Sequence, residues 1–304
     1  MPSTTYAAES KIVDLDGPTH YLDFGGPSDG PLILAVHGLS GAAWNWLAVA
    51  PLLTQRCRMI AVDLAGHGET PRVDRSTTVR ANRRLLDRFI REVVGEPVVL
   101  MGNSMGGLIT LLESAAAPDL VEGAILVDPA VPGPLLTSVD RRTAMQFAVV
   151  AIPKLGEAAM ARRRGQQSVA EQVRETLKFC TVDVNRIPNE VIEAGIASIN
   201  SRKPGDFTPA DIMIAGRSLL RLMSRPQALR RRFRAVTAPV LLIHGDRDRL
   251  VSIKVAKACA RAFPEWRLEI ATDIGHVPML ETPEWTAEKV LDWMTTDAKL
   301  LDPA

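Results

Sequence analysis

The sequence predicts an α/β protein whose central sheet is mostly parallel and carries helices on both faces. Short apolar runs of strand length alternate along the chain with longer stretches of helical periodicity. Such alternation is typical of parallel strands joined by crossover helices. At 304 residues and 46% hydrophobic content, the length favours one large domain with an insertion over two equal domains.

The expected elements follow in chain order. Two short strands around Asp16-Gly17-Pro18 predict an N-terminal hairpin over residues 12–24. Apolar runs then predict further strands near residues 32–36, 58–62, 97–101, 124–127, 239–243 and 267–271. Helical spacing predicts helices near residues 46–54, 77–94, 106–117, 253–262 and 283–296.

Residues 131–235 interrupt this alternation, because they contain no strand pattern. Apolar clusters of helical spacing occur there at 145–152, 169–180, 187–199 and 212–223, and prolines separate them. We therefore expect an inserted helical unit over 131–235, between a first core part at 1–130 and a second at 236–304. The faces marked by Met145, Phe147, Ile212, Leu219 and Met223 meet either substrate or the core.

The stretch Gly102-Asn103-Ser104-Met105-Gly106-Gly107 follows a predicted strand and precedes a predicted helix. A strand, a Gly-x-Ser-x-Gly turn and a helix together indicate a nucleophile elbow. The glycines remove side chains that would collide at so sharp a turn. The helix N-terminus favours negative charge beside Ser104. The pattern predicts a nucleophilic serine.

Other strand ends carry polar motifs in a fixed order. His37-Gly38-Leu39 follows the strand at 32–36, Asp63-Leu64-Ala65-Gly66-His67-Gly68 follows the strand at 58–62, and Gly245-Asp246-Arg247-Asp248 and Gly275-His276 follow the last two strands. With the elbow, this order and spacing resemble the α/β-hydrolase superfamily over about residues 12–128 and 236–298. The resemblance implies the α/β-hydrolase fold, with a helical cap as the insertion.

A serine nucleophile needs a base, and His276 is the candidate, since it alone of the five histidines follows the last predicted strand. In the family, the matching Gly-His supplies the catalytic histidine. The base needs an orienting carboxylate. The family pattern favours Asp248 and leaves Asp246 as a turn residue with a local hydrogen bond, while Asp128 is an alternative because some relatives place the acid there.

The resemblance also implies an oxyanion hole made by the backbone N–H groups of Leu39 and Met105. Asp63 and its following glycines are expected to shape a tight turn rather than to touch substrate. Trp44 and Trp46 line either an acyl pocket or the core. Histidines other than His276 are expected to be buried structural residues.

The expected function is hydrolysis of a small-molecule or lipid carboxylic ester through an acyl-enzyme on Ser104. The same triad resembles those of carbon–carbon bond hydrolases, thioesterases and perhydrolases or haloperoxidases, and a non-catalytic ligand receptor is a further alternative. Val277 stands where carbon–carbon hydrolases usually have tryptophan. No motif for a metal or a cofactor occurs, and none is expected.

Charge is uneven along the chain, although the net charge is only +1. Residues 136–235 carry 18 Lys and Arg against 9 Asp and Glu, with the densest runs at 162–164 and 230–232. These arginines form either a solvated face or a peripheral contact with anionic membrane. The low net charge argues against nucleic-acid binding.

Three widely spaced cysteines fit reduced thiols. The first residues lack the pattern of a secretory signal, and no apolar run approaches 18 residues. These features predict a cytoplasmic protein.

Overall fold

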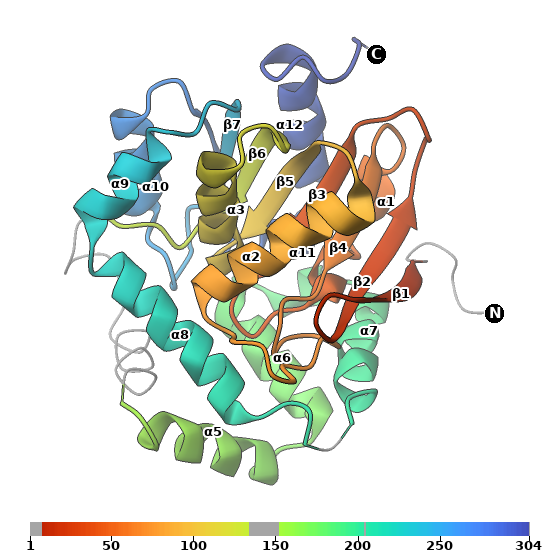
Figure 1. Ribbon diagram of the computed structural model, residues 1–304, viewed down its shortest axis with the longest axis vertical. Coiled ribbons are helices and arrows are strands. Elements are labelled where there is room, and N and C mark those ends of the chain that lie inside the picture. The colour runs from red at the N-terminus through yellow and green to blue at the C-terminus, as the bar shows by residue number, and fades with distance from the viewer. Residues whose placement is uncertain (1–7, 134–151, 204, 304) are drawn as a thin grey trace.

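A computed structural model describes residues 8–133, 152–203 and 205–303 of the chain. Its centre is an 8-stranded sheet in the order β1-β2-β4-β3-β5-β6-β7-β8 (Figure 1). The first pairings, β1 with β2 and β2 with β4, are antiparallel, and all others are parallel. The strands are β1 (Glu9–Asp14), β2 (Pro18–Gly25), β3 (Leu32–Val36), β4 (Arg58–Val62), β5 (Val98–Asn103), β6 (Val121–Val127), β7 (Val240–Gly245) and β8 (Arg267–Ala271). The predicted hairpin and all six predicted strands are confirmed.

Helices cover both faces of the sheet, as predicted. Outside the segment between β6 and β7, they are η2 (Ala43–Trp46), α1 (Ala50–Leu53), α2 (Val79–Phe89), η3 (Ile90–Val94), α3 (Met105–Ala116), α10 (Ile253–Ala262), α11 (Pro278–Glu281) and α12 (Pro283–Thr296). Side chains alternate along β3: Leu34 packs with the apolar residues of α2, α3 and α10, and Ile33 with those of α1 and α12. The result is a three-layer arrangement with two cores.

Two of the expected helices are divided differently. The stretch expected as one helix at 46–54 forms the short η2 and α1, and Pro51 lies in the first turn of α1. The stretch expected at 77–94 is α2 followed by the π-helical turn η3. It ends at Gly95, whose φ of +76° suits the left-handed region that a helix C-terminus often needs.

The segment between β6 and β7 is helical in its described part, and we call its helices the helical insertion. They are α5 (Leu155–Gln166), α6 (Val169–Cys180), η4 (Val184–Arg186), α7 (Asn189–Asn200), α8 (Pro209–Met223) and α9 (Pro226–Phe233). Three expected clusters match α6, α7 and α8. The cluster expected at 145–152, with Met145 and Phe147, lies outside the described residues except for residue 152. The exact domain boundaries stay a prediction.

The helical insertion packs on the core at several places. On α8, Ala215 and Leu219 join the cluster that α2 and α3 form, and Ile212 is also buried. That apolar face therefore meets the core. On α7, Gly195 lies directly against the Trp44 ring of η2. Figure 1 shows α5 to α8 together at one end of the sheet.

Among the described residues, no helix has the length and apolar character that crossing a membrane requires.

Candidate active site

Ser104 occupies a single-residue turn between β5 and α3. Its φ is +53° and its ψ is −114°, an unfavourable conformation for a residue with a side chain. The surrounding backbone enforces it, since Ser104 N donates to Val127 O at 3.0 Å and Ala130 N donates to Ser104 O at 2.9 Å. The strained turn leaves Ser104 partly exposed at the carboxyl end of the sheet.

The glycines of the motif are needed for close backbone packing. A Cβ on Gly102 would lie 2.4 Å from Gly106 O, and a Cβ on Gly106 would lie 2.1 Å from Val36 O. Both distances are far below a carbon–oxygen contact. The first glycine thus lets the helix fold back over the strand, and the second lets α3 begin against β3.

The loop after β3 passes directly beside the serine. A Cβ on Gly38 would lie 3.1 Å from Ser104 Cβ, so the main chain of residue 38 is next to the nucleophile. Leu39 follows at once in this loop, and Met105 is the first residue of α3. These are the positions at which sequence reasoning expects oxyanion donors.

Asp248 and His276, although 28 residues apart, are hydrogen-bonded through their side chains. His276 Nδ1 lies 2.7 Å from Asp248 Oδ2. The other oxygen, Asp248 Oδ1, accepts from Leu250 N at 2.7 Å and Val251 N at 3.1 Å. Burial alone would raise the pKa of the Asp248 carboxyl, but the neighbouring His276 and the hydrogen bonds that Asp248 accepts hold it below its usual value. An ionised acceptor keeps the proton of His276 on Nδ1 and leaves Nε2 able to take a proton.

The His276 loop is fastened to the elbow and to the helical insertion. The Asn103 side chain donates from Nδ2 to His276 O at 3.0 Å and to Val127 O at 3.1 Å. On the other side, His276 N donates to Cys180 O at 2.6 Å. The residue before the serine and the end of α6 therefore fix the histidine backbone between them.

Glu281 of α11 strengthens the same junction. Its Oε1 accepts from Val182 N and Asp183 N, both at 2.9 Å, and its Oε2 accepts from Gly275 N at 2.8 Å. Sequence reasoning missed Glu281, Asn103 and Cys180. Asn103 lay inside the motif at a position that any residue can fill, and nothing in the sequence places Glu281 beside residues 182 and 183.

The two alternative aspartates lie elsewhere. Asp246 Oδ1 accepts from Asp273 N at 2.8 Å, so its bond joins two loops and is not the local one expected. Asp128 is buried, and its Oδ1 accepts from Gly245 N at 3.0 Å. No hydrogen bond joins Asp128 to His276 among the described residues, whereas Asp248 has one.

The Asp63 turn matches its expected structural role. Asp63 is buried and accepts from His20 Nδ1, Ala43 N and Glu69 N at 2.7 to 2.8 Å. A Cβ on Gly68 would lie 2.0 Å from this carboxylate, and the φ of Gly68 is +52°. His20, His37, His67 and His244 are all buried.

One group of residues in the described part of the chain is close enough to hold a metal. An oxygen of Asp128, an oxygen of Asp248 and a ring nitrogen of His244 lie within 4.8 Å of one another. His244 Nε2, however, donates to Val251 O at 2.8 Å and therefore carries its proton. This nitrogen has no lone pair for a metal, and Asp248 already binds His276.

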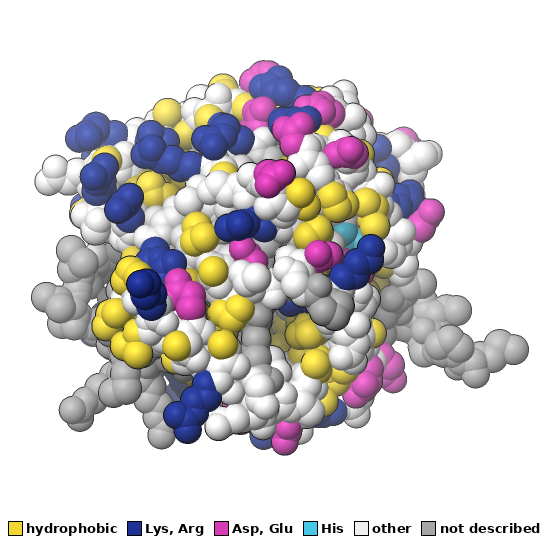
Figure 2. Space-filling model, turned by 60° about the horizontal axis from the view of Figure 1, so that its bottom comes forward, with side chains coloured by type: hydrophobic (Ala, Val, Ile, Leu, Met, Phe, Trp, Pro, Cys, Tyr) yellow, Lys and Arg dark blue, Asp and Glu magenta, His cyan; other side chains and the backbone are white. Residues whose placement is uncertain are grey.

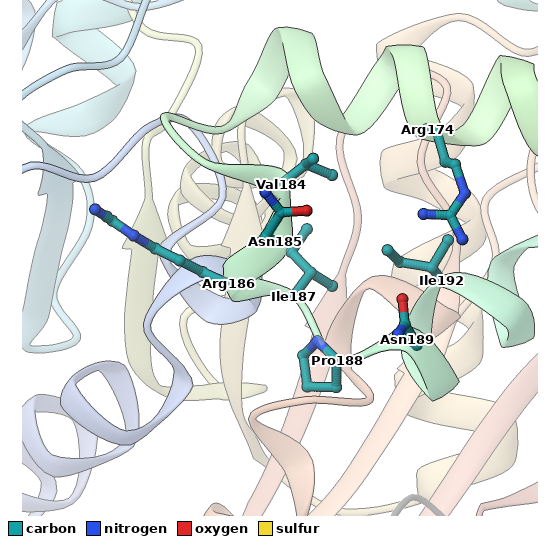
Figure 3. A pocket seen from close by; sticks show the side chains of 8 residues that line it. All are labelled: Arg174, Val184, Asn185, Arg186, Ile187, Pro188, Asn189 and Ile192. Carbon is teal, nitrogen blue, oxygen red and sulfur yellow. The ribbon is translucent and has the colours of Figure 1, made fainter.

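A cavity of about 330 Å³ lies within the helical insertion. Figure 3 shows Arg174 of α6 on one side of it and Asn189 and Ile192 of α7 on the other. Ser104, Asp248 and His276 do not line it, so it is not a candidate acyl site. Trp46 is fully buried in the core, and Trp44 packs on α7.

Comparison with known proteins finds relatives that match most of this chain. Human monoacylglycerol lipase ABHD6 is 23% identical over 275 residues, which are 90% of this chain and 77% of that protein. An uncharacterised protein of Mycobacterium tuberculosis is 29% identical over 88% of this chain and 76% of its own length.

A solved structure of a putative lipase from Acinetobacter baumannii superposes with a TM-score of 0.75 at 23% identity, and covers 98% of this chain and 93% of its own. The ancestral haloalkane dehalogenase AncHLD2 also gives 0.75 at 23% identity, with 96% and 100% covered. At such identities these structures show a shared fold. The model of the alpha/beta hydrolase family matches residues 33–289, so this chain belongs to that family.

Proposed function

We propose that this hydrolase cleaves carboxylic esters, with Ser104 as nucleophile, His276 as general base and Asp248 as the orienting acid. The observation that carries the proposal is the 2.7 Å hydrogen bond between His276 Nδ1 and Asp248 Oδ2. The loop that carries His276 is hydrogen-bonded to Asn103, the residue before Ser104. Ser104 itself lies in a strained strand-to-helix turn. A base, an orienting acid and an accessible nucleophile are what acyl transfer requires.

The reaction has two halves. His276 Nε2 takes the hydroxyl proton as Ser104 Oγ attacks the ester carbonyl, and the same proton then passes to the leaving alcohol. Water next attacks the acyl-enzyme with His276 again as base, the acyl–oxygen bond breaks as that proton returns to Ser104 Oγ, and the acid leaves. The N–H groups of Leu39 and Met105 are proposed to stabilise each oxyanion, where loss of one donor typically costs about a hundredfold or more in rate.

The relatives support a lipid-like ester as substrate. Several curated relatives that match about nine-tenths of this chain are named monoacylglycerol lipases. We therefore propose a monoacylglycerol or a similar single-chain ester as the substrate class.

The test is hydrolysis of p-nitrophenyl esters from acetate to palmitate, and of a monoacylglycerol, by the wild type and Ser104→Ala. We expect the wild type to turn over the esters and Ser104→Ala to lose about 10⁶-fold in kcat, as removal of a triad nucleophile does. A fluorophosphonate probe should label the wild type and not Ser104→Ala. The chain-length optimum would size the acyl site.

Other outcomes lead to other functions. Probe labelling without turnover of any ester would overturn the ester assignment and favour a carbon–carbon hydrolase, a thioesterase or a perhydrolase with the same nucleophile. Failure of the folded wild type to react with the probe would favour a non-catalytic ligand receptor.

A further inference from the structure

The Asp248 carboxylate has a second buried carboxyl group beside it, on Asp128, and an oxygen of each lies within 4.8 Å of the other. Asp128 follows β6, and Asp248 follows β7, the adjacent strand. Both side chains are 0% exposed. Two negative charges so close together without solvent would repel strongly, because a buried charge is stabilised only by an opposite charge or by hydrogen-bond donors.

The donors available to the two carboxyl groups are unevenly shared. Asp248 accepts hydrogen bonds from Leu250 N, Val251 N and His276 Nδ1, so both of its oxygens have partners. In the described part of the chain, the Asp128 side chain accepts one hydrogen bond, from Gly245 N to Oδ1, and its Oδ2 is buried without a partner. Protonation of that oxygen removes the uncompensated negative charge and turns it into a hydrogen-bond donor, which costs the least free energy.

Histidine 244 does not neutralise the pair. Its Nε2 lies 3.5 Å from Asp128 Oδ1 and 3.7 Å from Asp248 Oδ2, beyond hydrogen-bond distance. That nitrogen instead donates to Val251 O, and burial lowers the pKa of His244. The imidazole is therefore neutral, and it supplies no positive charge that could offset two ionised carboxyl groups.

We propose that Asp128 is a protonated carboxylic acid that donates a hydrogen bond from Oδ2 to Asp248 and holds that carboxylate in position for His276. Asp128 is thus a positioning residue of the proposed triad, and the proposal rests on the proposed function. The proton stays on Asp128 throughout the reaction: Asp248 accepts from both Asp128 and His276, and the pair keeps a single negative charge.

The surroundings of Asp128 agree with this assignment. Burial raises the pKa of the Asp128 carboxyl well above its usual value, and the charges of Asp248 and Glu281 raise it further, against a smaller lowering by the Gly245 N–H. Cys180, from α6, is a neutral thiol near Asp248, because burial raises its pKa to about 12. His244 and His276 are the histidines beside the two carboxyl groups in the described part of the chain.

Two variants separate the protonated from the ionised form. Asp128→Asn keeps an N–H donor toward Asp248 and an oxygen for Gly245 N, whereas Asp128→Ala removes both. We expect Asp128→Asn to retain most of the wild-type kcat, and Asp128→Ala to lose about ten- to a hundredfold in kcat with little change in KM. Asp246→Ala, which removes the nearby aspartate that binds Asp273 N, is the matched control and should keep the wild-type profile.

The pH at which kcat/KM falls on the acid side of its pH profile is a second measurement, and a loss of packing alone does not change it. If Asp128 is protonated, Asp128→Asn changes no charge and this pH stays the same. If Asp128 is ionised, the variant removes a negative charge near His276, the pKa of the imidazole falls, and the acid side of the profile moves to lower pH. Such a shift would overturn the proposal.

Infrared difference spectroscopy tests the proton independently of catalysis. The wild type minus Asp128→Asn spectrum at neutral pH should contain the carbonyl band of a carboxylic acid, even if no ester is a substrate. A carboxylate band in its place would overturn the proposal. So would a divalent metal ion that copurifies with the wild type and is lost from both Asp128 variants. If the acid band is present but esters are not hydrolysed, the proposed function is wrong, and the assignment of a proton to Asp128 is retained.

Discussion

His67 is a buried residue whose neutral form the fold requires. The residue is 1% exposed, and the centroid of its ring lies 5.2 Å from that of His37. Its Nδ1 donates to Ala65 O at 3.2 Å, while Nε2 has no partner in the described part of the chain. Burial lowers the pKa of His67 to about 3, with a further lowering by the charge of His37.

This depressed pKa predicts a loss of stability in mild acid. The unfolded chain takes up a proton near pH 6.5, and the folded chain does not until about pH 3. The contribution is therefore complete above pH 6.5 and falls as pH decreases, by about 2 kcal/mol at pH 5. His67→Gln should weaken this dependence of the free energy of unfolding, measured by urea denaturation at each pH. Equal slopes for both proteins would contradict the prediction.

Residues of the candidate site were predictable where chemistry and spacing coincide. Ser104 is recognisable from its glycines, and His276 and Asp248 from their places after the last two strands. The roles of neighbouring side chains were not, because they depend on distances across the sheet. Asp128 was predicted only as an alternative acid, and the sequence does not show that it lies beside Asp248.

Glu281 is the carboxylate that joins three elements: α11, the turn after α6 and the histidine loop. Glu281→Ala would leave the N–H groups of Val182, Asp183 and Gly275 without their acceptor. An unsatisfied buried donor costs about 1 to 3 kcal/mol. We expect a loss of about 3 kcal/mol or more in the free energy of unfolding, and a lower kcat because Gly275 precedes His276.

The matched control is Glu284→Ala, which removes an exposed glutamate at the start of α12. It should leave stability within about 0.5 kcal/mol of the wild type. If both variants unfold at the same urea concentration, the carboxylate of Glu281 does not hold the junction together.

Among the elements, the buried strands were the most readily predicted. The buried strands of the parallel sheet have nearly continuous apolar sequences, and every one was predicted. Helices α5 and α9 were predicted only as part of the helical unit over 131–235 and not as separate clusters, since their sequences are rich in arginine and polar residues and offer little apolar periodicity. Only Leu229 and Phe233 of α9 are buried. The split of residues 46–54 into two short helices depends on packing in the core, and the spacing of apolar residues in the sequence does not predict such packing.

The surface of the whole molecule is asymmetric in charge. Lys and Arg side chains gather at the upper left of Figure 2, the side on which Figure 1 shows α8 and α9. Arg230, Arg231 and Arg232 in the last turns of α9 are exposed. We propose that this surface makes a peripheral contact with anionic lipid, which would bring a lipid ester to the enzyme.

Binding to vesicles tests that contact. The wild type should bind vesicles of anionic phosphatidylglycerol at low salt and release them at high salt, and should not bind zwitterionic vesicles. Changing Arg230, Arg231 and Arg232 to Gln should reduce binding at least about tenfold. The control changes Arg84, Arg88 and Arg91 to Gln, with the same loss of charge on α2 and η3. Equal losses in both triple variants would indicate only a response to net charge.

The Asn103 side chain restricts which sequences can form this elbow. A general Gly-x-Ser-x-Gly motif allows any residue at the second position, but here one short amide donates two hydrogen bonds, one to Val127 O at the end of β6 and one to His276 O in the loop after β8. Aspartate has no such hydrogens at neutral pH, serine has one, and glutamine is a methylene longer. A redesign of this protein therefore has less freedom at residue 103 than the motif suggests, because a change there also releases the backbone of His276.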